Sequence, residues 1–191
     1  MRYDKGHKDE TRRHILDVAS TQFRESGIAA VGLAGIMSEA GLTNGAFYTH
    51  FASKEELVRE VLTDALTRRE ERHRANLESG VALETTIRDY LSTRHRDHAG
   101  KGCPTAALVA EIARHPKATR DAFTGKVADF ITLMTEQIRH GSAKERRRKS
   151  IAIYSTMVGA LQLARAVNDK TLSDEILENA VEAAVTIANA R

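Results

Sequence analysis

The chain has 191 residues, a length that suits one sizeable domain or a small module joined to a larger one. Hydrophobic residues make up 41% and charged residues 29%, a globular balance that excludes wholesale disorder, and no apolar run is long enough for a membrane span. The single cysteine excludes an internal disulfide and a four-cysteine zinc site, so we expect a reducing, cytoplasmic setting. The net charge of +3 is too small to identify a partner.

Two prolines and many Ala, Leu, Glu and Arg residues predict an all-α fold of about nine helices. The first helix is expected from Lys8 to Ser26, because Ile15, Ala19 and Phe23 recur at helical spacing before Gly27. The other expected helices follow in order: 33–40, 44–50, 54–77, 82–98, 104–114, 117–140, 143–168 and 173–189.

Capping residues mark several of these boundaries. Ser53 and Glu56 have the spacing of a capping box before the long fourth helix, and Ser142 and Glu145 repeat it before the eighth. Pro104 stands where proline is favoured, in the first turn of the sixth helix.

The second and third predicted helices are joined by Gly41-Leu42-Thr43, which is the layout of a helix-turn-helix. If Phe47 and Phe51 turn inward, one helical turn apart, the polar residues between and before them face outward. Amide, hydroxyl and imidazole groups of this kind suit the edges and phosphates of a DNA major groove.

The run Gly41-Leu42-Thr43-Asn44-Gly45-Ala46-Phe47-Tyr48-Thr49-His50-Phe51-Ala52-Ser53-Lys54 resembles the DNA-binding signature of TetR-type (tetracycline-repressor-like) transcriptional regulators. The resemblance implies a three-helix DNA-binding domain at 1–53 and an effector-binding and dimerisation domain at 54–191. It implies phosphate contacts for Tyr48, His50 and Lys54. The expected DNA-binding residues are Thr43, Asn44, Gly45, Ala46, Tyr48, Thr49, His50 and Lys54.

Two positions depart from the family pattern. Gly32 replaces the usual Ser or Thr cap of the second helix, and Gly35 weakens that short helix by about 1 kcal/mol relative to alanine. A helical adaptor that has lost DNA binding is therefore an alternative function. An enzyme is not expected, because no phosphate-binding loop, dinucleotide fingerprint or nucleophile elbow occurs.

The last two predicted helices carry apolar residues on more than one face, which predicts a homodimer through a four-helix interface. The alternative is that both are core helices of a monomer. Since one short recognition helix reads few base pairs, a dimer would read two half-sites of an operator.

The resemblance also implies an unidentified small-molecule effector that releases the operator. Candidate effector-binding residues are Cys103, Phe123, Phe130, Met134 and Met157. The alternative is that these side chains only pack in the hydrophobic core. Cys103 lies at an expected helix N-cap, where the helix dipole favours thiolate, and could sense an electrophile; a small buried hydrophobe is the alternative. No cofactor and no metal site are expected, because His95 and His98 have no further ligands nearby.

Overall fold

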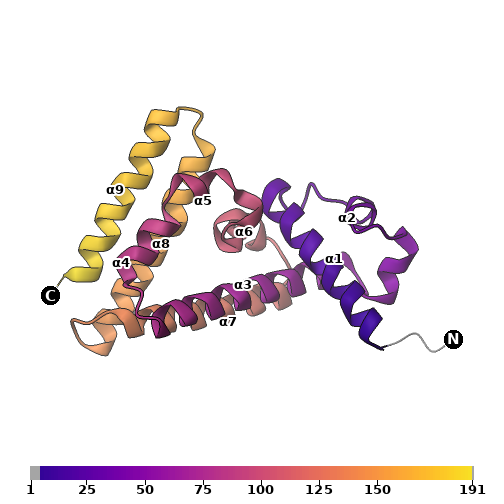
Figure 1. The fold of residues 1–191 in the computed structure, drawn as a ribbon, viewed down its shortest axis with the longest axis horizontal. Coiled ribbons are helices and arrows are strands. Elements are labelled where there is room, and N and C mark those ends of the chain that lie inside the picture. The colour runs from indigo at the N-terminus through magenta and orange to yellow at the C-terminus, as the bar shows by residue number, and fades with distance from the viewer. Residues whose placement is uncertain (1–4, 191) are drawn as a thin grey trace.

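The computed structural model of this protein describes residues 5–190, which are largely helical and contain no strand, as the all-α prediction requires. Figure 1 shows α1 and α2 at one end, α8 and α9 paired at the other, and α3 running beside α7 between them. The elements are α1 (Lys5–Ser26), α2 (Leu33–Glu39), the 3₁₀ helix η1 (Asn44–Thr49), α3 (Lys54–Glu78), α4 (Leu83–Tyr90), α5 (Thr93–Asp97), the 3₁₀ helix η2 (Ala99–Lys101), α6 (Pro104–Ile112), α7 (Lys117–Gln137), α8 (Ala143–Ala166) and α9 (Lys170–Asn189).

The first of two buried clusters, the amino-terminal cluster, joins α1, α2 and η1 to the first turns of α3 and to α6. Its fully buried side chains, each contributing roughly 2 kcal/mol, include Phe23, Ile36, Phe47, Phe51 and Leu57. Because the first turns of α3 complete this cluster, a domain boundary at residue 53 stays a prediction.

The second, the carboxyl-terminal cluster, lies between α4, α6, α7, α8 and α9. Its members include Ile87, Cys103, Phe130, Met157 and Leu177. The antiparallel pair α8 and α9 forms one side of this cluster (Figure 1).

The expected turn of the helix-turn-helix is present. Gly41 has a φ of +70°, the left-handed conformation that glycine adopts without strain, and Leu42 N donates to the Met37 carbonyl over 2.8 Å. The segment that follows is a 3₁₀ helix. The Phe47 carbonyl accepts from both His50 N and Phe51 N, a tight turn that places Phe47 and Phe51 in the core.

A single helix over 82–98 was the wrong expectation, because α4 ends at Tyr90 and α5 begins at Thr93. The Ser92 hydroxyl accepts from His95 N over 3.2 Å and so caps a new helix. The His95 ring also binds the Tyr90 carbonyl over 2.7 Å, which closes the bend between the two helices.

The start of α9 also differs, again because of a cap. Helix α9 begins at Lys170, three residues before the expected start, because the Asp169 carboxylate accepts from Thr171 N and Leu172 N. Glu145 completes the predicted capping box with Ser142, but the Glu56 carboxylate accepts from Ala52 N instead of Ser53 N. Within 5–190, no helix combines the length and apolarity needed to cross a membrane.

Candidate nucleic-acid interface

The short helix η1 is held by two aromatic rings that point into the amino-terminal cluster. Phe47 and Phe51 are stacked with ring centroids 5.5 Å apart, and both are almost completely buried. Since an isolated helix of this length would not persist in water, these rings are what fixes the orientation of its opposite face.

That opposite face consists of the residues that the sequence predicted to face outward. Thr43, Asn44, Gly45, Tyr48 and Thr49 are exposed, and the Tyr48 ring is 67% exposed while its edge contacts Phe47 at 5.2 Å between centroids. We call this set the recognition surface. Two of its hydroxyls differ in availability: Thr49 Oγ1 donates to the Ala46 carbonyl over 2.7 Å, whereas the Thr43 side chain makes no capping bond.

Ala46 and His50 lie at the margin of the recognition surface and are half-buried. Burial lowers the pKa of His50, and the positive charges of Lys8 and Arg12 lower it further, so this imidazole is neutral at pH 7. A neutral imidazole can still donate one N–H to a phosphate oxygen.

The side chain of Lys54 makes its contacts outside the recognition surface. Its Nζ donates to the Ile28 carbonyl over 2.7 Å and lines a pocket of about 650 Å³ beside Glu111 and His115. The phosphate contact assigned to Lys54 stays a prediction, and it requires the ammonium to leave or share the Ile28 carbonyl.

Besides the ion pairs between α1 and α3, three polar links join the amino-terminal segment or the start of α3 to α6, η2 and α7, and no sequence pattern predicted them. Arg24 Nε donates to the Gly100 carbonyl over 2.7 Å, just before α6. At the other end of α6, the Glu111 carboxylate accepts from the backbone N–H groups of Ile28 and Ala29 over 3.1 and 2.8 Å. We call these first two links the α6 links.

The third link is at the start of α3. The Glu55 carboxylate binds His115 Nδ1 over 2.9 Å and accepts from Thr119 Oγ1 over 2.5 Å. The position of the recognition surface is therefore tied to α6 and to the start of α7.

Cys103 is the N-cap of α6, as expected, and is only 5% exposed. Its backbone N–H donates to His95 Nε2, and its Sγ accepts from Arg69 Nη1 over 3.3 Å. Burial opposes ionisation of the thiol, but the Arg69 charge and hydrogen bonds outweigh burial and lower the pKa of Cys103. Arg69 is a residue that the sequence analysis did not single out.

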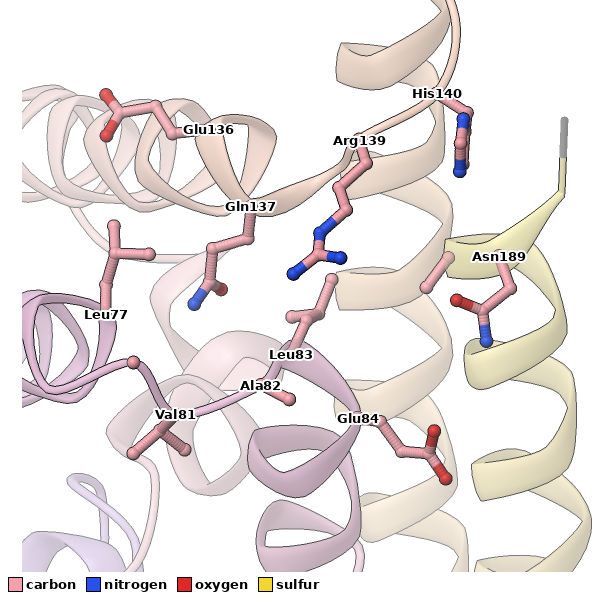
Figure 2. Close-up of a pocket in the computed structure, with 12 residues that line it drawn as sticks. Leu77, Val81, Ala82, Leu83, Glu84, Glu136, Gln137, Arg139, His140 and Asn189 are labelled. Carbon is pink, nitrogen blue, oxygen red and sulfur yellow. The ribbon is translucent and has the colours of Figure 1, made fainter.

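The candidate effector-binding residues separate into two groups. Cys103, Phe130, Met134 and Met157 lie together in the carboxyl-terminal cluster, whereas Phe123 packs against the amino-terminal cluster. All five lie outside the lining of a pocket of about 510 Å³ at the far end of α3 and α7, which Figure 2 shows. Among residues 5–190, no three His, Cys, Asp or Glu side chains gather as metal ligands would.

Two family models match the chain. Residues 15–61 match the model described as "Bacterial regulatory proteins, tetR family", and residues 82–180 match "Tetracyclin repressor-like, C-terminal domain". The second match alone covers more than half of the chain.

Curated relatives match over shorter stretches. The chain is 33% identical over 92 residues to the transcriptional repressor KstR2 of Rhodococcus jostii, covering 48% of this chain and 45% of the relative. It is 43% identical over 60 residues to the transcriptional regulator AcrR of Shigella flexneri, covering 31% and 28%. The chain thus aligns with less than half the length of each of these two relatives.

Solved structures show the same fold over nearly the whole chain. The reduced form of E. coli NemR superposes with a TM-score of 0.76 at 23% identity, covering 92% of this chain and 95% of that one. A TetR-family regulator from Cytophaga hutchinsonii gives a TM-score of 0.78 at 16% identity, covering 98% and 100%. Together with the family models, these likenesses show that the chain belongs to the TetR family of bacterial regulatory proteins.

Proposed function

We propose that this protein is a transcriptional repressor that binds double-stranded operator DNA in the cytoplasm through its recognition surface. The observation that carries the proposal is Tyr48, an aromatic side chain that stays exposed while its edge rests on the buried Phe47 ring. A phenol fixed in this way presents a hydroxyl to a phosphate at little cost in side-chain entropy. Asn44 and Thr49 lie beside it for contacts to base edges.

The experiment compares operator affinity, measured by fluorescence anisotropy, between two single variants. Tyr48→Ala should weaken operator binding by about 10- to 100-fold, the loss expected for one important DNA contact. Thr124→Ala is the control, because Thr124 is exposed on α7, away from the recognition surface. Equal affinity of the two variants would contradict the proposal.

We further propose a homodimer through α8 and α9. Much of the apolar surface that suggested this interface is used within the protomer, since Ile153, Met157 and Leu161 are buried. Two apolar side chains of α8 remain outside: Ile151 is 43% exposed and Leu163 is 58% exposed. They lie 12 residues apart along α8, about 120° apart around its axis at 3.6 residues per turn, and the family of the chain supports covering both with a second copy.

Leu163→Glu tests the dimer by sedimentation velocity. A charge in place of Leu163 should produce monomers that keep the helical circular-dichroism spectrum of the wild type. Thr124→Glu, on α7, should leave the dimer intact, and a dimeric Leu163→Glu protein would contradict this interface.

Release of the operator by a small-molecule effector is supported by the α6 links. Gly100, in η2 just before α6, and Glu111, in the last turn of α6, are both hydrogen-bonded to the segment that carries the recognition surface. A ligand that favours another position of α6 would therefore move the recognition surface and change its spacing in a dimer, a coupling of typically 1–3 kcal/mol.

Cys103 offers one way to displace α6, because an electrophile bonded to its sulfur would need room at the first turn of the helix. The Arg69 guanidinium beside the sulfur favours the reactive thiolate. We propose that modification of Cys103 weakens operator binding. Operator release by N-ethylmaleimide should be absent in Cys103→Ser; equal release in both proteins would exclude this thiol as the sensor.

A further inference from the structure

Arg69 is an interior cation without a carboxylate partner. Its guanidinium lies 3.7 Å from the centroid of the Phe130 ring and 4.8 Å from that of Tyr154. Within 5–190, no Asp or Glu forms an ion pair with it, and its hydrogen bonds are made by Nη1, to Cys103 Sγ and to the Tyr154 hydroxyl over 2.8 Å. Its Nη2 is buried and has no hydrogen-bond partner in that part of the chain.

Arg69 Nη2 is one of several buried polar atoms without partners along a single face of α3. His73, one turn further along α3, has an unpaired buried Nε2, and its ring lies 5.1 Å from that of Phe130. The hydroxyl of Tyr90 and Oε1 of Gln137 are also buried and unpaired among the described residues. Native interiors leave few such atoms; because Gln137 lies against His73 and Tyr90 against Cys103, the clearest unmet hydrogen bond in the strip is that of Arg69 Nη2.

These side chains form a continuous strip. The Tyr90 ring lies 5.7 Å from the Arg69 guanidinium, and the Tyr90 hydroxyl lies beside the Cys103 sulfur, whose pKa it helps to lower. At the other end of the strip, the Gln137 amide lies beside His73. The strip therefore runs from Tyr90 and Arg69, past His73, to Gln137.

Gln137 and Leu77 belong to the wall of the pocket of about 510 Å³. Leu77 continues the face of α3 that carries Arg69 and His73, at intervals of four residues, so the strip and the pocket share one side of this helix. Figure 2 shows the Gln137 amide, the Arg139 guanidinium and the Leu83 side chain around the pocket. The volume suits a small molecule.

We propose that this strip and pocket form one binding site for an effector with a carboxylate at one end and an apolar body. The carboxylate would accept hydrogen bonds from Arg69 Nη2 and the Tyr90 hydroxyl, and the apolar body would extend past His73 toward Leu77. A carboxylate supplies a negative charge and two acceptor atoms for the side of the guanidinium that faces away from Cys103. The proposal rests on the effector-binding role proposed above and names the chemical class of that effector.

Octanoate is the probe, with octan-1-ol as its neutral counterpart, and binding is measured by titration calorimetry on the full chain without DNA. Octanoate should bind saturably and octan-1-ol at least about tenfold more weakly, because a hydrogen bond to a charged group is worth that factor or more. Equal binding of the two probes would overturn the proposal, as would no binding of octanoate to a protein that still binds its operator.

Three variants locate the carboxylate. Arg69→Gln and Tyr90→Phe should each weaken octanoate binding by about 10- to 100-fold, whereas Arg74→Gln, an exposed arginine of the same helix, should leave it unchanged. Tyr90→Phe decides the question if Arg69→Gln does not fold. It removes only an unpaired hydroxyl, so the ligand-free protein should keep its stability while losing affinity.

Cys103→Ser separates this site from the thiol. Octanoate should still bind to it, because Arg69 Nη2 and Tyr90 do not depend on the sulfur. Loss of octanoate binding in Cys103→Ser, or unchanged binding in Arg69→Gln and Tyr90→Phe, would contradict the assignment. Operator affinity measured in parallel on the same proteins reports separately on the DNA-binding function.

Discussion

The two buried clusters of this protein treat polar groups in opposite ways. Charged groups at the edge of the amino-terminal cluster, such as Glu111 and Lys54, are hydrogen-bonded to backbone atoms. The carboxyl-terminal cluster packs around Arg69, His73 and Tyr90, each of which has a buried polar atom without a partner in residues 5–190. The first arrangement suits a rigid platform, and the second suits a region whose packing changes when a missing partner arrives.

Truncating a buried ring of the amino-terminal cluster should have the largest effect on stability. Phe47→Ala removes a fully buried ring that stacks on Phe51, so the free energy of unfolding should fall by about 3–5 kcal/mol. The neighbouring exposed ring is the control: Tyr48→Ala should change the free energy of unfolding by less than about 0.5 kcal/mol. Urea denaturation measures both changes. Similar losses of stability in the two variants would mean that the Phe47–Phe51 stack does not stabilise the amino-terminal cluster.

Removing one α6 link should have the next largest effect. Glu111→Ala leaves the N–H groups of Ile28 and Ala29 without their carboxylate acceptor, which should cost about 2 kcal/mol in urea denaturation. Glu71→Ala, at an exposed position of α3, should cost almost nothing. A Glu111→Ala protein as stable as Glu71→Ala would show that the two regions are not coupled through this carboxylate.

The histidine of the carboxyl-terminal cluster predicts a pH dependence. Burial lowers the pKa of His73 below its ordinary value of about 6.5; the Gln137 amide opposes this shift, and the Arg69 charge adds to it. The unfolded chain therefore takes up a proton near pH 6.5 that the folded chain resists. The stability from neutral His73 is fully present above pH 6.5 and is lost as the pH falls below it.

His73→Gln should flatten the stability curve between pH 6.5 and 5 by at most about 1.4 kcal/mol per pH unit, the limit for one proton. His14→Gln, at an exposed position of α1, is the matched control and should follow the wild-type curve. Parallel curves for wild type and His73→Gln would contradict the burial of this imidazole.

A helix cap should give the smallest effect. Ser142→Ala removes the hydroxyl that accepts from Glu145 N at the start of α8, and should lower the free energy of unfolding by about 1 kcal/mol. Unchanged thermal and urea midpoints would show that the capping box adds nothing to the pairing of α8 with α9.

The amino-terminal unit was predicted better than the rest because the features that shape it depend on residues close together in the sequence. Gly41 marks the turn, and the four-residue spacing of Phe47 and Phe51 places their rings inside and Tyr48 outside. The contacts of Arg69, Glu111 and Lys54 could not be predicted in the same way, because their partners lie tens of residues away along the chain. Only packing brings these groups together.

Selection of bound duplexes from a pool of random DNA, using the wild-type protein, tests the central claim most directly. A dimer carrying two recognition surfaces should enrich a palindrome whose half-sites are about 10 base pairs apart or a multiple of that spacing. The same protein with Tyr48→Ala should enrich the same palindrome more weakly, because losing a phosphate contact lowers affinity for all sequences alike. A folded wild-type protein that leaves the pool unenriched would contradict the account.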